Sequence, residues 1–311
     1  MRIAVMGTGA VGAYFGARLA AIAANDLAFV ARGAHLEAMR KQGLVVKSYE
    51  GDRVVANALY TDTPAQVGPV DLVLFCVKSY DTEAAAQAIA PMMRPNTILL
   101  SLQNGVDNGD RLARFYGHER ILPAVVYVGS ALAGPGVVEH TSGGRVIFGS
   151  RDGKENTATR MVAQALAAAQ IPHEVTPHIA QVQWRKLLWN AAFCAISVLA
   201  HADTREIVES ATLNQLAVDC MHEVRDAAAA VGIALAPAAI DETMAFSRTV
   251  GHFKPSMLQD LAAGKRLEYQ AFNGIVVETL TQVGKTAPIN QVFCQTLAFL
   301  DQRMRERRKG G

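Results

Sequence analysis

A Gly-x-Gly-x-x-Gly motif at Gly7, Gly9 and Gly12 constrains the fold of this chain more than any other feature. The motif directly follows the apolar run "RIAVM", and a helical pattern continues from about Val11 to Ala24. Between a strand and a helix, the first glycine permits a tight turn. The second lets the backbone approach a pyrophosphate, and the third lets the helix pack against the strand. An ordinary β-α turn is the alternative, but this context favours a dinucleotide-binding loop. Its residues are Gly7, Thr8, Gly9, Ala10, Val11 and Gly12.

Along the first 177 residues, short apolar runs alternate with helical patterns, which is typical of β-α units on a largely parallel sheet. Residues 43–57 have the pattern of a hairpin, and β-rich runs between residues 121 and 149 favour antiparallel strands that close the sheet. Beyond Pro177 the strand patterns stop, and helical patterns continue to about Arg305. The sequence thus predicts an α/β fold. An N-terminal Rossmann-like dinucleotide-binding domain (residues 1–177) precedes an all-α domain (residues 178–311).

Charge, cysteine and histidine usage exclude several kinds of partner. The formal net charge is +2, which gives no electrostatic case for binding nucleic acid. The four cysteines form no Cys-x-x-Cys pair and the eight histidines have no ligand spacing, so we expect reduced thiols and no metal site. The apolar helical run from Leu187 to Ala202 is shorter than a bilayer span. We expect a cytoplasmic protein with no nucleic-acid or membrane partner.

Polar residues at three predicted strand ends indicate how a nucleotide could be held. Arg32 lies at the end of the second strand, twenty residues beyond Gly12. An acid there would bind the ribose 2′-hydroxyl of NAD, whereas an arginine suits the 2′-phosphate of NADP, so we predict NADP. Lys78 follows "VLFCV" and Asn104 follows a second apolar run, "ILLS". Beyond the carboxyl ends of strands, both could reach the cofactor or an anionic substrate, although each alone could be an ordinary loop residue.

A lysine opens an otherwise apolar stretch in the helical half. Lys186, Asn190 and Cys194 have i, i+4, i+8 spacing and would lie in one stripe of a regular helix. This helix is the first of the second domain, close to the domain boundary, and ligand sites favour inter-domain clefts. The alternative is a lysine whose stem covers apolar surface while its ammonium group stays in water. Ser256 and Glu268 lie at predicted helix starts, where a plain cap and a favourable end charge would also explain them.

Five stretches of the chain, in the same order, resemble the ketopantoate reductase (2-dehydropantoate 2-reductase) family. They are "GTGAVGAYFGARLA", "VKSYDT", "QNGV", "WRKLLWN" and "PSMLQDLAAGKRLEYQAFNG". The resemblance implies a Rossmann-like domain plus a helical domain, with the active site in the cleft. It also implies NADPH-dependent reduction of a small-molecule 2-keto acid, ketopantoate or a close analogue, to a 2-hydroxy acid.

At the matching positions, the resemblance implies a role for each polar residue. Lys186 matches the family's catalytic lysine, and Glu268 matches an acid close to both that lysine and the ligand. Asn190 matches a substrate-binding asparagine, and Ser256 a group near the substrate carboxylate. The matches beside the ribose and the nicotinamide are Lys78 and Asn104.

Three departures from the family pattern put ketopantoate itself in doubt. Cys194 and Thr204 stand where the family has asparagines, and Phe253 occupies a position that is often polar. Each change removes a hydrogen-bonding group from the predicted substrate side, which favours a less polar 2-keto acid. Two other functions stay open: a β-hydroxyacid dehydrogenase, and a non-catalytic NADPH-binding sensor, against which Lys186 and Glu268 argue. The sequence leaves the pathway and the oligomeric state open, with a homodimer as one option.

Overall fold

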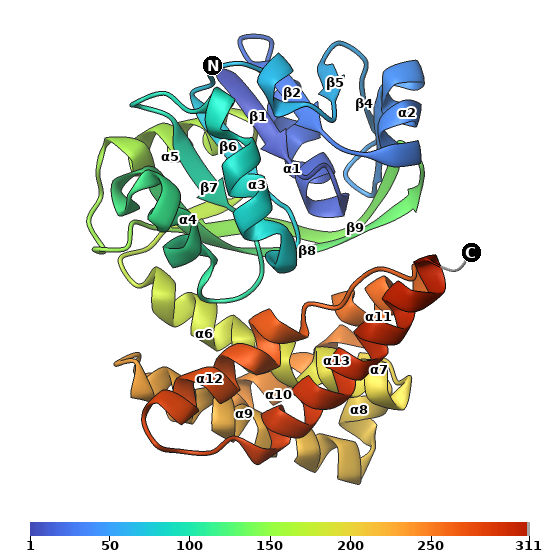
Figure 1. Ribbon diagram of the computed structural model, residues 1–311, viewed down its shortest axis with the longest axis vertical. Coiled ribbons are helices and arrows are strands. Elements are labelled where there is room, and N and C mark those ends of the chain that lie inside the picture. The colour runs from blue at the N-terminus through green and yellow to red at the C-terminus, as the bar shows by residue number, and fades with distance from the viewer. Residues whose placement is uncertain (310–311) are drawn as a thin grey trace. The chain divides into compact units, whose positions relative to one another are not determined.

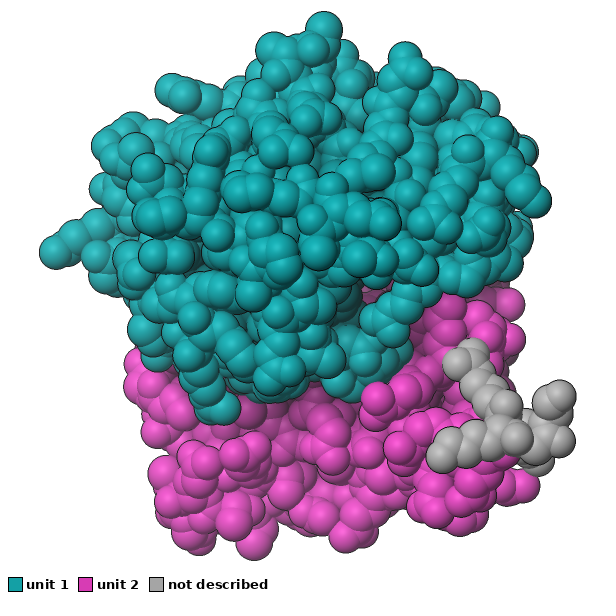
Figure 2. All heavy atoms as spheres, turned by 45° about the horizontal axis from the view of Figure 1, so that its top comes forward, with its two compact units in different colours: residues 1–179 teal, residues 180–311 magenta. Residues whose placement is uncertain are grey.

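The computed structural model describes residues 1–309, and the side chains of residues 1–306. The chain forms two compact units, residues 1–179 and residues 180–311, coloured teal and magenta in Figure 2. Figure 1 shows strands with helices in the first unit and, in the described part of the second, helices alone. The fold class predicted from the sequence is confirmed.

Six parallel strands form the centre of the first unit's sheet, in the order β5-β2-β1-β6-β7-β8. The chain runs from β1 to β2 on one side and returns to β6 on the other, so the strand order reverses between β1 and β6. In open α/β sheets, ligands bind beyond the carboxyl ends of the strands at such a switch point. The strands are β1 (Arg2–Met6), β2 (Asp26–Val30), β5 (Leu59–Thr61), β6 (Leu72–Phe75), β7 (Ile98–Ser101) and β8 (Ile121–Gly134).

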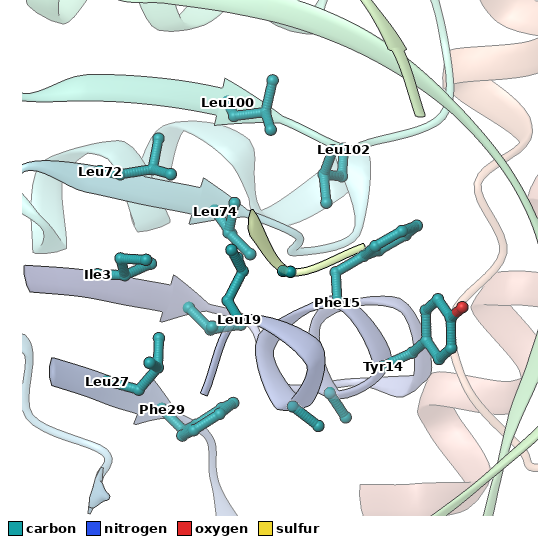
Figure 3. Close-up of a cluster of buried hydrophobic side chains, with 14 of the residues drawn as sticks. Ile3, Tyr14, Phe15, Leu19, Leu27, Phe29, Leu72, Leu74, Leu100 and Leu102 are labelled. Carbon is teal, nitrogen blue, oxygen red and sulfur yellow. The ribbon is translucent and has the colours of Figure 1, made fainter. Parts of the chain in front are cut away.

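Buried apolar clusters cover both faces of this sheet, because alternate strand residues point to opposite sides. Ile3 and Val5 of β1 belong to the cluster that includes α1, α2 and α5, whereas Ala4 and Met6 belong to the cluster of α3 and α4. Figure 3 shows Phe15 and Leu19 of α1 among the strand residues of the first cluster. The helices are α1 (Ala10–Ala20), α2 (Gly33–Gln42), α3 (Thr82–Ala88), α4 (Asn108–Tyr116) and α5 (Thr157–Ala168). Short 3-10 turns are η1 (Pro64–Gln66), η2 (Ser79–Asp81), η3 (Ala90–Met92) and η4 (His118–Arg120).

A second group of strands extends the sheet past β8. β8 pairs antiparallel with β9 (Val137–Phe148), with register shifts that mark bulges. β9 also pairs in parallel with β3 (Leu44–Ser48) and β10 (His173–Val175), and β3 forms an antiparallel hairpin with β4 (Arg53–Val55). The predicted hairpin and antiparallel closure are confirmed. Two details differ: α1 ends at Ala20 rather than near Ala24, and the short strand β5 has no counterpart in the prediction.

The second unit is built around one continuous helical segment. It comprises α6 (Ile179–Trp189), a π-helical turn η5 (Asn190–Cys194) and α7 (Ala195–Ala200), and its residues 191–195 are fully buried. Around it lie α8 (Thr204–Glu209), α9 (Ala211–Ala230), α10 (Ala239–Val250), α11 (Ser256–Ala262), a second π-helical turn η6 (Gln270–Gly274), α12 (Ile275–Gln282) and α13 (Pro288–Lys309). Among the described residues, no helix is long and apolar enough to cross a membrane.

Candidate active site

The three motif glycines of the first unit have different surroundings. Gly7 has a φ of +94°, and a Cβ there would lie 2.8 Å from the backbone nitrogen of Val77. At Gly12 a Cβ would lie 2.4 Å from the carbonyl oxygen of Gly7, so only glycine lets α1 pack this closely. A Cβ at the exposed Gly9 would meet no atom of the described chain within 4 Å. The loop is therefore tightly packed at Gly7 and Gly12 and open at Gly9.

The other loop residues hold this geometry in place. Thr8 is buried, and both its hydroxyl and its N–H donate to the carbonyl oxygen of Val30 at 3.0 Å. Its side chain therefore ties the loop to the end of β2. Ala10 and Val11 form the first turn of α1, which carries no acidic side chain. Because the first N–H groups of a helix lack partners within the helix, this turn can receive a pyrophosphate.

Arg32 stands at the N-cap of α2, just beyond β2. Its side chain is 75% exposed and its Nη2 lies 3.7 Å from Oδ2 of Asp81. A pair this exposed is weak, so the guanidinium group is accessible to an anionic ligand.

Lys78 and Asn104 follow the neighbouring strands β6 and β7, and Gln103 joins their loops. The amide of Gln103 donates to the carbonyl oxygen of Val77 at 3.1 Å and to the hydroxyl of Thr82 at 2.8 Å. The structure thus brings the Lys78 and Asn104 loops together, and both side chains are half-buried. The sequence analysis missed Gln103, because nothing in "SLQNGV" indicates that this side chain turns inward.

Lys186 lies in the last turn of α6 and is half-buried. Burial lowers the pKa of its ammonium group to about 8, and the nearby side chains of Cys194 and Glu268 oppose this lowering. A lysine on the solvated surface would keep its ordinary pKa. Lys186 is instead partly withdrawn from solvent and lies near Cys194 and Glu268.

Asn190 and Cys194 are the first and last residues of the π-helical turn η5. The sequence predicted a regular helix here, and the structure instead has a π turn, which holds an extra residue per turn. Asn190 is 5% exposed and Cys194 is fully buried. The sulfur of Cys194 lies 3.9 Å from the hydroxyl oxygen of Ser256, so η5 and α11 meet at this pair.

Ser256 and Glu268 lie at helix starts, as predicted, but their surroundings differ from those of simple caps. Ser256 is the first residue of α11, whose N-cap is Pro255. The Glu268 carbonyl accepts the N–H of Ala271 at 3.1 Å, which opens the next helix. The Glu268 side chain is 4% exposed and acts on the pKa of Lys186, so it is a buried charge rather than a solvated end charge.

An aromatic cluster flanks these residues. Trp189 stacks on Phe193 with ring centroids 5.2 Å apart and lies 6.2 Å from Phe253. Thr204, which the sequence analysis placed on the substrate side, is fully buried. Its hydroxyl and N–H both donate to the carbonyl oxygen of Phe253 at 2.9 Å. The Thr204 hydroxyl thus holds the Phe253 backbone, and the loss of a hydrogen-bonding group on the substrate side stays a prediction.

The two units carry complementary chemistry. The first offers a glycine-rich loop at the switch point of a parallel sheet, with an accessible arginine at the end of the next strand. The second offers a half-buried lysine, Lys186, whose pKa burial lowers to about 8, near the buried carboxyl group of Glu268. Each of these features is typical of dinucleotide-dependent oxidoreductases. Among the described residues, no cluster of His, Cys, Asp and Glu could hold a metal ion.

Comparison with known proteins gives the family. The ketopantoate reductase PanE/ApbA model matches residues 3–153, and the model of its C-terminal part matches residues 178–301. The chain belongs to this family.

Individual relatives match this chain over nearly their full length. A 2-dehydropantoate 2-reductase of Archaeoglobus fulgidus is 31% identical, covering 94% of this chain and 95% of its own. The crystal structure of a PanE/ApbA family ketopantoate reductase from Ralstonia eutropha superposes with a TM-score of 0.91 at 32% identity, over 98% of this chain and 100% of that chain. A D-mandelate dehydrogenase solved with NADH and anilino(oxo)acetate shares the fold, with a TM-score of 0.90 at 21% identity, over 98% of this chain and 100% of its own.

Proposed function

We propose that this protein reduces the keto group of a 2-keto acid to a hydroxyl group with NADPH. The observation that carries the proposal is Lys186, a half-buried lysine whose pKa is lowered to about 8 and which is coupled to the buried Glu268. Such a group can donate a hydrogen bond to a carbonyl oxygen and then release its proton near neutral pH. Family membership supports the same reaction type.

The first unit fits a dinucleotide. The space in front of Gly9, which a Cβ would enter, and the first turn of α1 would hold the pyrophosphate. Lys78 and Asn104 would lie along the ribose and the nicotinamide. The exposed guanidinium group of Arg32 would bind the 2′-phosphate, which favours NADPH over NADH. When bound, the reduced nicotinamide supplies the hydride for the keto carbon.

The residues of the second unit would act on the keto acid. Lys186 would stabilise the negative charge that builds on the carbonyl oxygen and then give its proton to that oxygen. Glu268 would keep the ammonium form of Lys186 populated against the cost of burial. Asn190 would orient the substrate or the lysine, and Ser256 would bind the substrate carboxylate.

We propose that the preferred substrate has a side chain less polar than that of ketopantoate. The supporting residues are Cys194, a thiol next to Ser256, and the half-buried rings of Trp189 and Phe253. Thr204 contributes indirectly, because its hydroxyl is bonded to the Phe253 carbonyl. A site lined this way offers few partners to a polar substrate tail, and buried polar groups without partners are rejected strongly.

The test is a panel of 2-keto acids that includes ketopantoate, pyruvate and 2-ketoisovalerate, with oxidation of NADPH followed by absorbance. We expect turnover of 2-keto acids, with branched apolar members competing well against ketopantoate. A parallel assay with 3-hydroxy acids and NADP tests the alternative function, a β-hydroxyacid dehydrogenase. Turnover of 3-hydroxy acids alone would contradict the proposal.

A further inference from the structure

The two π-helical turns of the second unit are joined by one buried side chain. Asn273, in η6, is fully buried, and its amide nitrogen donates to the carbonyl oxygen of Ala191 in η5 at 3.0 Å. Ala191 follows Asn190 directly, and η6 begins two residues after Glu268. A bond across these turns therefore ties the backbone next to Asn190 to the helix that Glu268 opens.

The orientation of Asn273 is fixed by its partners. A backbone carbonyl can only accept, so Asn273 must present its NH2 group to Ala191. The same NH2 group donates to Oδ1 of Asn290 at 2.9 Å, and Asn290 is also fully buried. The NH2 group of Asn290 then donates to Oε2 of Glu223 at 2.8 Å. The carboxylate can only accept, so both amides are held in one orientation.

Glu223 is itself held at the start of α13. Its two carboxylate oxygens accept the N–H groups of Ile289 and Asn290, each at 2.9 Å, so they cap the first turn of that helix. The chain of bonds thus runs from α9 through the start of α13 to η6 and ends on η5. Each link is buried or half-buried, where hydrogen bonds are strong and a missing partner is costly.

The segment on the other side of Glu268 is also held by α13. The N–H of Leu267, the preceding residue, donates to Oδ1 of Asp301 at 2.9 Å. Asp301 is fully buried and lies within 4 Å of two guanidinium groups, at 3.3 Å from Arg305 and 3.6 Å from Arg266. The backbone around Glu268 is therefore fixed both before and after this residue.

We propose that Asn273 is a positioning residue, which sets the placement of Glu268 and Asn190 relative to Lys186 by joining η6 to η5. The inference rests on the proposed function for the role of Lys186. Asn273 contacts the backbone of η5 and does not touch the reacting groups. It acts by placing Glu268 and Asn190. Small displacements of a proton donor are expensive in catalysis, so a bond that fixes its neighbours affects the rate.

The test compares Asn273→Ala, and the milder Asn273→Ser, with the wild-type protein. A matched control is Asn214→Ala on α9, because the Asn214 amide also donates to a backbone carbonyl at 3.0 Å, that of Val208. The first readout is kcat and KM on the best 2-keto acid of the panel. The second needs no substrate: lysines are reductively methylated with isotope-labelled methyl groups, and the Lys186 signal, assigned with Lys186→Arg, is titrated by NMR.

We expect kcat of the folded Asn273 variants to fall by about 10- to 100-fold, with a much smaller change in the dissociation constant for NADPH. The titration midpoint of Lys186 should fall by roughly 0.5, because the carboxylate of Glu268 is held less firmly. Asn214→Ala should leave both unchanged.

If Asn273→Ala and Asn273→Ser lower only the melting temperature, and leave kcat and the titration midpoint of Lys186 unchanged, Asn273 is merely structural and the proposal is wrong. An upward shift of the midpoint would also overturn it. Failure of the wild-type protein to turn over any keto acid would count against the proposed function. The NMR titration of Lys186 needs no substrate, so it would still test the role of Asn273 in that case.

Discussion

The sulfur of Cys194 lies 3.9 Å from the hydroxyl oxygen of Ser256. An asparagine at position 194 would bring an amide to that hydroxyl, so Cys194→Asn should shift preference toward ketopantoate. We expect the ratio of kcat/KM for ketopantoate over 2-ketoisovalerate to rise about tenfold. Cys194→Ala is the control, since it removes the thiol without adding an amide. The idea fails if the unmodified protein already prefers ketopantoate by orders of magnitude.

Substitution by alanine should affect cofactor binding at Gly9 and protein stability at Gly12. At Gly9 the added methyl group points into open space, so Gly9→Ala should keep the melting temperature of the cofactor-free protein. Affinity for NADPH should weaken by about tenfold or more, because the methyl group occupies pyrophosphate space. At Gly12 the methyl group would lie 2.4 Å from a backbone oxygen, so Gly12→Ala should lower the melting temperature. Thermal melting measures the stability of each variant, and isothermal titration measures its affinity for NADPH. Equal losses of stability in the two variants would contradict the different roles given to Gly9 and Gly12.

The parts of the site that could be predicted from the sequence are those that depend on local geometry. The spacing of Gly7, Gly9 and Gly12 after an apolar run reflects a turn that few other residues can make, and the structure shows that turn. Likewise, the long apolar runs before Lys78 and Asn104 predicted strands, since strands buried on both faces have few alternatives.

Other features depend on contacts between distant parts of the chain. The π-helical turn at Asn190–Cys194 is not visible in the apolar pattern, which fits a regular helix equally well. The sequence could not show that the hydroxyl of Thr204 turns to the Phe253 carbonyl, 49 residues later. The link from Asn273 to Ala191, 82 residues away, was missed for the same reason.

Arg32→Asp should reverse the cofactor preference. Replacing the exposed guanidinium group removes a charge-assisted bond to the 2′-phosphate, worth about 1.5–3 kcal/mol, and adds a carboxylate that suits a ribose hydroxyl. We expect kcat/KM for NADPH to fall by roughly 10- to 100-fold while that for NADH is maintained or rises. Arg145→Asp, which changes an exposed arginine paired with Glu174, is the control. Equal use of both cofactors by the unmodified protein would contradict the role of Arg32.

The rate of reduction should decline above a pH of about 8, the pKa to which burial lowers Lys186. The protonated amine is the acid in the reduction, and a lowered pKa means that it loses its proton earlier as the pH rises. The plot of kcat against pH should therefore have a basic limb that falls roughly tenfold per pH unit.

Lys186→Arg tests the origin of this limb. Arginine stays protonated up to a pH of about 12, so the limb should vanish in the variant even though its kcat is lower. A limb that persists unchanged in Lys186→Arg would assign it to another group.

The central claim is that Lys186 is the proton donor, and Lys186→Ala tests it most directly. Removal of the amine should lower kcat by about 10²–10⁴-fold, while the dissociation constant for NADPH, measured by titration, stays close to that of the wild type. Arg185→Ala is the matched control, because Arg185 is the adjacent cation of α6 and forms an exposed pair with Glu242 at 2.5 Å. Its kcat should be unchanged. A folded Lys186→Ala protein that binds NADPH and retains a near-normal kcat would contradict the claim.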